Sequence, residues 1–226
     1  YGALERLAEL SGEDTPTPTP QPTPTPEPEP EPTSPTGDTT VSTASELEDA
    51  LDSVTGGETI VLEDGDYGSL DISGLDFSDY VTIRSETPLA ATFTYITMDA
   101  SSHIRIDGVH VDNPGNGGVG TKLVSIEDSS HIQFVNSEVN GRVDDDYLGF
   151  YALNTRDSTD VTFENNYLHD VLKGGVLYTT EGLNIVGNRA DNIGTDMFQF
   201  IGKDDLLIEN NIGPRYAYPQ PGDHAD

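Results

Sequence analysis

The chain has 226 residues, of which 41 are acidic and only 10 are basic, so its formal net charge is −31 at pH 7. A surface with this charge repels nucleic acid phosphates and anionic lipid headgroups, so we expect no nucleic acid partner. No segment holds the roughly 20 apolar residues that cross a bilayer, so we expect no membrane insertion, and the lack of cysteine excludes disulfides.

The first 39 residues form two segments that cannot build a core of their own. Residues 1–14 place four apolar side chains at helical spacing: Leu4, Leu7, Ala8 and Leu10. This pattern predicts a short amphipathic helix, which is either the end of a preceding domain or an anchor to another protein chain. Residues 15–39 are rich in Thr-Pro and Glu-Pro, which predicts a disordered, extended linker. At about 3.1 Å per residue, the linker can separate its neighbours by as much as roughly 60 Å.

The folded domain, which we place at residues 40–226, is predicted to begin with a helix. Ser45 is the expected N-cap, and Gly56 and Gly57 end the helix. One face of this helix is apolar: Leu47, Ala50, Leu51 and Val54. A short strand, residues 59–62, follows. A helix in this place suits a repetitive fold whose open end must be covered.

A repeat of 22 to 29 residues decides the fold class. Six short strands alternate apolar and polar residues, and they begin at Val81, Ile104, Ile132, Val161, Leu183 and Leu206. A second strand precedes each of the last four, and it is marked by Val124 and Ile126, Leu153 and Thr155, Gly175 and Leu177, and Phe198 and Phe200. Five residues take one fixed position after the repeat strand: Val109, Ser137, Asn166, Asn188 and Asn211. The last three predict an asparagine ladder between successive turns.

These features predict an all-β fold, a right-handed parallel β-helix, with an N-terminal capping helix. A leucine-rich repeat would need a leucine-asparagine consensus, and a β-propeller would need blades of about 40 residues or more. The longer repeats carry their extra residues in two loops, 114–120 and 142–150, so the insertions gather at one edge of the solenoid.

Two adjacent columns of polar residues are expected on one exposed face. The first contains His110, Glu138, Tyr167 and Arg189, and the second contains Asp112, Asn140, His169 and Asp191. Because side chains alternate along a strand, both columns point outward. We take Glu138, Tyr167, His169 and Arg189 as candidate substrate-binding residues. The alternative is that these are the polar outer positions of any solenoid.

A third column lies ten residues before each repeat strand and contains Lys122, Tyr151, Lys173 and Asp196. A lysine and a tyrosine together can neutralise the carboxylate of a uronic acid and move its α-proton. Lys173, Tyr151 and Asp196 are therefore candidate catalytic residues. The alternative is a row of corner residues that form local salt bridges.

Two further acidic clusters are candidate sites. His224 and Asp226 are candidate catalytic residues, because we expect Asp226 to stack on Asp196 one turn earlier. The run Asp144, Asp145 and Asp146 is a candidate calcium site, and the alternative is a solvated acidic turn. Because Tyr1 replaces the usual Met and the last turn is unfinished, we expect the native sequence to extend beyond both ends.

The residues also resemble a known superfamily. Residues 45–67, with Gly-Gly-Glu-Thr-Ile-Val-Leu and Asp-Gly-Asp-Tyr, resemble the start of pectin-lyase-like β-helix proteins, above all chondroitinase-B-like and alginate-lyase-like enzymes. Residues 195–200, 207–211 and 222–226 resemble secreted bacterial β-helix proteins, often with calcium-binding repeats, and mannuronan epimerases. The resemblance implies that Lys173 and Arg189 correspond to the lysine base and arginine acid of the lyases. The Asp-Pro-His-Glu-Gln run of the epimerases is absent.

Together these features predict an extracellular, secreted protein that binds or modifies an acidic polysaccharide. If it is an enzyme, it acts by β-elimination or C5 epimerisation on a uronate polymer, with Ca²⁺ as a possible cofactor. The alternative is a non-catalytic receptor-binding or adhesive module on a virion surface, such as a phage tail fibre or tail spike. Phage tail spikes share the fold, and the proline-rich stalk would tether the module.

Overall fold

The computed structural model describes residues 37–114, 118, 120–141, 149–202 and 204–213. The predicted N-terminal helix and most of the predicted linker lie outside the described residues. Strand β1 (Asp38–Val41) begins within the last two residues of the predicted linker. No helix among the described residues is long and apolar enough to span a membrane.

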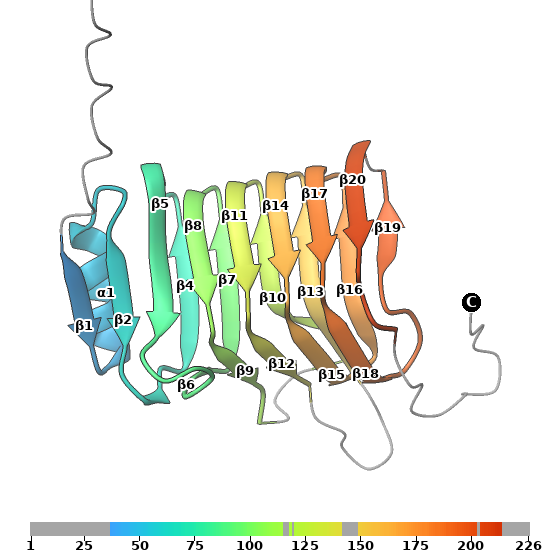
Figure 1. Ribbon diagram of the computed structural model, residues 1–226, viewed down its shortest axis with the longest axis horizontal. Helices are drawn as coiled ribbons and strands as arrows, with labels where there is room; N and C mark the ends of the chain where they lie inside the picture. The colour runs from blue at the N-terminus through green and yellow to red at the C-terminus, as the bar shows by residue number, and fades with distance from the viewer. Residues whose placement is uncertain (1–36, 115–117, 119, 142–148, 203, 214–226) are drawn as a thin grey trace, which may run out of the picture. The chain divides into compact units, whose positions relative to one another are not determined.

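Three parallel sheets form a solenoid, and each turn of the chain passes through sheets A, B and C in order (Figure 1). We call one such turn a rung. Sheet A has the spatial order β1, β2 (Thr59–Leu62), β5 (Asp76–Ser85), β8 (Ser102–Asp107), β11 (Ser130–Val135), β14 (Thr159–Glu164), β17 (Glu181–Val186) and β20 (Asp204–Glu209). Sheet B has the order β3 (Gly65–Asp66), β6 (Ala91–Phe93), β9 (His110–Asp112), β12 (Glu138–Asn140), β15 (Tyr167–Val171) and β18 (Arg189–Ile193). Sheet C has the order β4 (Ser69–Ser73), β7 (Tyr95–Asp99), β10 (Thr121–Glu127), β13 (Phe150–Arg156), β16 (Lys173–Tyr178) and β19 (Gln199–Ile201).

The predicted register between repeats is confirmed. In sheet A, Val81 pairs with Ile104, Ile104 with Ile132, and Ile132 with Val161. The second predicted strand also pairs as expected, because Ile126, Thr155, Leu177 and Phe200 follow one another on successive rungs of sheet C. Since the side-chain period of a strand is two residues, this register directs every apolar column to the same interior.

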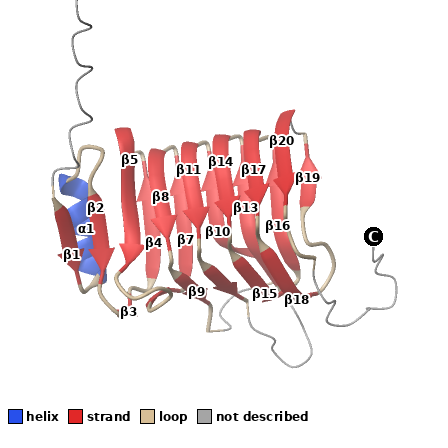
Figure 2. Ribbon diagram, in the orientation of Figure 1, coloured by secondary structure: helices blue, strands red, loops and turns tan. Residues whose placement is uncertain are grey.

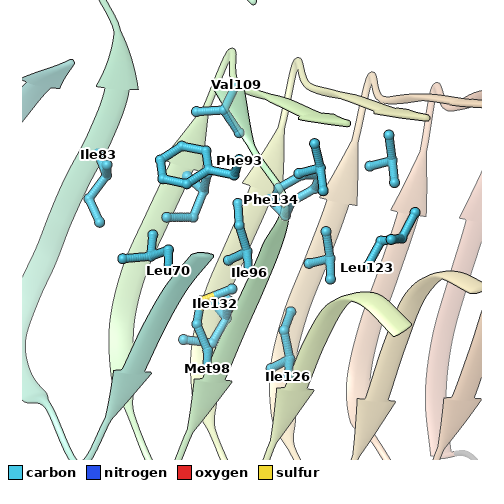
Figure 3. Packing of buried hydrophobic residues seen from close by; sticks show 14 of the residues in the cluster. Leu70, Ile83, Phe93, Ile96, Met98, Val109, Leu123, Ile126, Ile132 and Phe134 are labelled. Atoms are coloured by element: carbon cyan, nitrogen blue, oxygen red, sulfur yellow. The ribbon is translucent and has the colours of Figure 1, made fainter. Parts of the chain in front are cut away.

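The interior is a continuous stack of apolar side chains (Figure 3). Phe134 and Phe163 lie on adjacent rungs and are fully buried, as are Ile104 and Ile106. Full burial of one such side chain contributes about 1.5–3 kcal/mol. Because each rung buries its apolar face only against its neighbours, the stability of the solenoid grows rung by rung.

Three turn positions hold the backbone in the left-handed region, and this explains the Gly, Asn and Asp of the repeat. Between sheets A and B the position is filled by Gly108, Asn136, Asn165, Gly187 and Asn210. Between sheets C and A it is filled by Gly74, Ala100, Asp128, Asp157, Thr179 and Gly202. Near the start of the sheet A strands it is filled by His103, His131, Asp160, Gly182 and Asp205. Glycine, asparagine and aspartate adopt this conformation most easily.

The asparagine ladder is present as predicted. The side-chain oxygen of Asn166 accepts a hydrogen bond from the backbone N–H of Ser137, at 3.0 Å. Asn188 accepts in the same way from Asn166 at 3.0 Å, and Asn211 accepts from Asn188 at 2.8 Å. The ladder therefore satisfies buried backbone groups at the corner between sheets A and B.

Helix α1 (Ala44–Ser53) lies beside β1 and β2 at the N-terminal end of the solenoid (Figure 2). Its side chains Leu47, Ala50 and Leu51 are buried in the same core as the strands. The predicted N-cap, Ser45, is wrong. The N-cap is Thr43, whose hydroxyl oxygen accepts a hydrogen bond from Glu46 N at 3.2 Å. Thr43 has extended backbone angles, as an N-cap requires, whereas Ser45 is already inside the helix.

Candidate functional site

The two predicted polar columns lie in register on the outer face of sheet B. His110, Glu138, Tyr167 and Arg189 pair in succession across β9, β12, β15 and β18. Asp112, Asn140, His169 and Asp191 pair in the same way. The residues between them, Val111, Val139, Leu168 and Ala190, are buried in the core. The alternation therefore directs both polar columns outward, as predicted.

Glu138 is the centre of a carboxylate and imidazole cluster on this face. Its Oε1 atom lies 3.0 Å from His169 Nε2 and 3.7 Å from His110 Nε2. The other ring nitrogen of His169, Nδ1, lies 2.7 Å from Asp170 Oδ2. Because both nitrogens of His169 contact carboxylate oxygens, the ring is held in one orientation, and each N–H of its protonated form has an acceptor.

Tyr167 lies between an imidazole and a guanidinium group. Its ring is stacked on the ring of His169 with 4.4 Å between centroids. On the next rung, the guanidinium carbon of Arg189 lies 5.0 Å from the centroid of the Tyr167 ring. Arg189 NH2 also lies 3.8 Å from Asp191 Oδ2. All four predicted substrate-binding residues, including Glu138, are therefore joined in one connected group.

The predicted catalytic column is also in register. Lys122 of β10 pairs with Tyr151 of β13, and Tyr151 pairs with Lys173 of β16. On the following rung, the carboxylate of Asp196 accepts a hydrogen bond from the ammonium group of Lys173. The Lys173 side chain is 17% exposed and that of Asp196 is 38% exposed, so this ion pair is partly screened by solvent.

The catalytic column and the sheet B cluster meet at one corner of the solenoid. β15 ends at Val171 and β16 begins at Lys173, so only Leu172 separates sheet B from sheet C on this rung. Asp170 and Asn192 hold this corner on successive rungs, both with left-handed backbone angles, and the amide of Asn192 donates to the carboxylate of Asp170. We call the cluster, the corner and the catalytic column together the polar face.

The cations of the polar face already have anionic partners. Lys122 Nζ donates to Glu127 Oε1 at 2.7 Å, and this hydrogen bond lowers the pKa of the Glu127 carboxyl. Within the described residues, the other ion pairs of lysine and arginine are Arg84–Asp38, Arg105–Asp107, Lys173–Asp196 and Arg189–Asp191. An anionic ligand on the polar face must therefore compete with carboxylates of the protein itself.

Several predicted residues lie outside the described part of the chain. These are His224, Asp226 and the candidate calcium ligands Asp144, Asp145 and Asp146. In the described ranges, no group of three or more histidine, aspartate and glutamate side chains is arranged to hold a metal ion. The calcium site and the catalytic role of the C-terminal cluster therefore stay predictions.

The repeat pattern missed Asp170 of the polar face and the buried residue Asn154. Asp170 directly follows a predicted column, but the pattern does not show that it contacts His169. Asn154 of β13 is fully buried and donates to Ser125 Oγ at 3.0 Å and to Glu127 Oε1 at 3.3 Å. Its register partner Ser125, a polar residue between two apolar ones, was the available signal.

Comparison with known proteins supports the architecture. The family model for a right-handed beta helix region matches residues 94–213, which is more than half of the chain. No curated protein matches the sequence. Among solved structures, a candidate glycosyl hydrolase from Parabacteroides merdae is similar, with a TM-score of 0.55 and 13% identity over 78% of this chain and 95% of that chain.

Two similar structures have lower TM-scores. A family 6 polysaccharide lyase from Pseudopedobacter saltans has a TM-score of 0.46 and 11% identity, over 74% of this chain and 58% of that chain. A rhamnogalacturonan lyase has a TM-score of 0.41 and 11% identity, over 75% of this chain and 57% of that chain. At these identities the likeness concerns the fold alone.

Proposed function

Because this chain belongs to the right-handed β-helix family, we propose that it is an extracellular protein that binds or modifies an acidic polysaccharide on its polar face. The solved structures of similar fold include two polysaccharide lyases and a candidate glycosyl hydrolase, by their descriptions. Such likenesses leave the activity open, so the proposal depends on the polar face itself.

The observation that carries the proposal is the pairing of Tyr151 with Lys173 on adjacent rungs. Strands of one sheet lie about 4.8 Å apart, so the two side chains can reach one sugar unit. In a β-elimination, Lys173 would neutralise the uronate carboxylate while Tyr151 removes the proton from the adjacent carbon. The electron pair of the broken C–H bond forms a C=C bond, the C–O bond to the leaving sugar breaks, and the leaving oxygen takes a proton from water.

Epimerisation would use the same first step. The proton removed from the carbon next to the carboxylate would be replaced by a proton from water on the opposite side of the sugar ring, with no bond to the next sugar broken. Lys173 would again stabilise the charge that develops on the carboxylate. The two reactions therefore differ in the product and share the residues Lys173 and Tyr151.

The charge of the protein sets a condition on this function. With a formal net charge of −31, the protein repels a polyanion at long range. Salt screens this repulsion over about 8 Å at physiological ionic strength. We therefore expect the affinity for a uronate polymer to increase when salt or a divalent cation is added, in contrast to a binding surface that is basic.

The test is incubation with alginate, pectin and chondroitin, with and without calcium. Ultraviolet absorbance of the unsaturated product reports β-elimination, and proton NMR of the polymer reports epimerisation. Lys173→Ala and Tyr151→Phe should each lower turnover by a factor on the order of 10². Arg84→Ala, which removes a cation from sheet A, should leave turnover unchanged. Absence of both products and of binding for all three polymers would reject the proposal.

The second candidate is a non-catalytic glycan-binding module. The ion pair between Lys173 and Asp196 favours it, because the ammonium group that would neutralise the uronate carboxylate in the reaction already has a carboxylate partner. This candidate expects saturable binding of a polysaccharide by the wild-type protein, with no change in the polymer. Binding that is weakened by Lys173→Ala, without any product over long incubation, would select it over the enzyme.

A further inference from the structure

Three aromatic rings lie in a row on the outer face of sheet A, which carries no residue of the polar face. They belong to Tyr80 of β5, His103 of β8 and His131 of β11, on three successive rungs (Figure 1). The ring centroids of Tyr80 and His103 are 5.6 Å apart, and those of His103 and His131 are 4.4 Å apart with nearly parallel planes. Each ring is partly exposed and directly precedes a fully buried residue, so the row faces outward. We call these three residues the aromatic row.

An irregularity in β5 brings Tyr80 into this row. The register between β5 and β8 shifts at residues 77–80, where four residues lie opposite His103 alone. Extra residues of this kind redirect side chains and are common next to functional sites. Burial raises the pKa of the Tyr80 hydroxyl group, and a hydrogen bond with Gln133 of β11 opposes this increase. The Tyr80 side chain therefore extends from its own strand across β8 to β11.

A guanidinium group in a fixed orientation lies beside the aromatic row. Arg105 NH1 donates to Gln133 Oε1 at 2.7 Å, and Arg105 NH2 donates to Asp107 Oδ2 at 2.8 Å. Arg105 Nε donates to the same oxygen of Asp107 at 3.2 Å, and the arginine side chain is 32% exposed. A guanidinium group has five N–H groups, of which three have these acceptors among the described residues. The other two can donate to a ligand on this face.

The surroundings of the aromatic row do not suit a protein or a metal ion. The exposed large apolar side chains of the described residues lie in β19, in β20 and at Ile212, and none lies on β5, β8 or β11. A stable protein interface needs an apolar centre, which this face lacks. The rings of His103 and His131 are nearly parallel, and the lone pairs of their nitrogens lie in the ring planes. These lone pairs therefore cannot converge on one metal ion.

A neutral sugar fits the features of this face. An anion is repelled by the net charge of −31, and Arg105 already has the carboxylate of Asp107 as its partner. A sugar ring has C–H groups that pack on aromatic rings and hydroxyl groups that both donate and accept hydrogen bonds. Arg105 can donate to such hydroxyls, and the carboxylate of Asp160, which lies 3.4 Å from His131 Nε2 and is 60% exposed, can accept from them. Since rungs are about 4.8 Å apart, the row spans roughly 10 Å, which is enough for about two sugar units.

We propose that the outer face of sheet A is a second glycan site, at which a neutral oligosaccharide packs on the aromatic row and its hydroxyl groups bind Arg105 and Asp160. The site extends over β5, β8, β11 and β14, and the strands on both sides of it, β2 and β17, belong to the described residues as well. Neither end of the solenoid therefore borders the site. The ligand carries no carboxylate, so this inference is independent of the polar face and of its proposed function.

The test is calorimetric titration of the full chain with four neutral oligosaccharides: cellohexaose, mannohexaose, xylohexaose and galactohexaose. The double variant His103→Asn/His131→Asn removes both imidazoles, and asparagine accepts the left-handed backbone of these two positions. We expect saturable binding of at least one oligosaccharide, and about tenfold weaker binding by the double variant. Tyr80→Leu removes the third ring and should weaken binding about fivefold. The control is Asn184→Ala, on the same face of sheet A in β17, which should bind as tightly as the wild-type protein.

Proton NMR of the histidine rings locates the bound sugar. The signals of His103 and His131, assigned from the two single asparagine variants, should shift when the oligosaccharide is added. Those of His110 and His169 should keep their positions, and a shift of these two signals instead would place the sugar on the polar face and overturn the proposal. Equal affinities of the wild-type protein and the double variant would overturn it as well. So would the absence of saturable binding for all four oligosaccharides up to about 10 mM.

Discussion

Replacing Asn188 by alanine should destabilise the protein far more than removal of an outward asparagine. The Asn188 carboxamide is fully buried and makes four hydrogen bonds. Its oxygen accepts from the backbone N–H and from the side-chain amide of Asn166, both at 3.0 Å. Its nitrogen donates to the carbonyl oxygen of Phe163 at 2.9 Å and to Asn211 Oδ1 at 3.0 Å.

The expected cost follows from the groups that the substitution leaves without these partners. The side-chain amide of Asn166 still donates to Phe134 O, and Asn211 Oδ1 still accepts from the backbone of residue 188. The backbone N–H of Asn166 loses its acceptor, and the Phe163 carbonyl loses a donor. A buried group that loses its partner costs about 1–3 kcal/mol, so Asn188→Ala should lower the free energy of unfolding by about 2–6 kcal/mol.

The chain itself provides an intermediate variant and a control. Ser137 fills the ladder position two rungs earlier, where its hydroxyl accepts from Val109 N at 3.1 Å and donates to Val135 O at 2.8 Å. Asn188→Ser should therefore cost less than Asn188→Ala. The control is Asn184→Ala, since Asn184 is half-buried on the outer face of β17 and makes one hydrogen bond of 3.4 Å. Its expected cost is about 0.5 kcal/mol or less.

The assay is urea unfolding followed by far-ultraviolet circular dichroism, because the chain has no tryptophan. If Asn188→Ala and Asn184→Ala shift the free energy of unfolding equally, the ladder does not hold the corner and the reasoning fails. If Asn188→Ser costs as much as Asn188→Ala, the serine hydroxyl does not replace the carboxamide oxygen as an acceptor. The lost hydrogen bond of the Asn166 backbone N–H is then not the main cause of the destabilisation.

Three further predictions concern the ion pairs and the turns. Asp196→Asn frees Lys173 from its ion pair and removes a negative charge. Calorimetry should therefore show an affinity for a uronate polymer about fivefold higher, which corresponds to an ion pair of about 1 kcal/mol. A lower affinity would contradict this prediction. Ala100→Gly should raise the free energy of unfolding by about 1 kcal/mol in urea titrations, because Ala100 has a φ of +45°, and a loss of stability would argue against strain at this turn. The pKa of Glu127 is lowered by its bond to Lys122, so its stabilising contribution is present above the ordinary value of 4.5 and is lost as pH falls through the folded-state pKa. The melting temperature of Glu127→Gln should therefore fall less than that of the wild-type protein between neutral and acidic pH. If both proteins show the same pH dependence, the bond between Glu127 and Lys122 is not its cause.

The fold was predictable because the repeat carries three independent signals. The apolar alternation sets the strands, the Gly, Asn and Asp residues set the left-handed turns, and Asn166, Asn188 and Asn211 set the register between rungs. A different register between the rungs would conflict with all three of these signals at once. The N-cap was missed because Thr43 and Ser45 are both competent caps, and only the packing of Leu47 and Leu51 on the core selects the start of the helix.

The columns of the polar face were predictable, but the contacts within them were not. A repeat shows which residues share a row, such as Lys122, Tyr151 and Lys173. It does not show how far a long side chain extends along its own strand. Lys122 contacts Glu127, which lies five residues later on the same strand. The rotamer of the lysine and the charge of the glutamate determine this contact, and the row of equivalent residues does not predict it. For the same reason, the sequence alone does not predict the contact between His169 and Asp170.

The corner between sheets B and C carries the longest insertions of the solenoid's described residues. Successive sheet A strands are separated by 23, 28, 29, 22 and 23 residues, and the two long intervals contain the loops near residues 114–120 and 142–149. The two long insertions thus directly precede the strands that carry Lys122 and Tyr151, while the core rows and the ladder keep their register. Evolution can therefore lengthen or shorten the surroundings of this face without a new fold, so related chains should differ in ligand preference mainly through these two loops.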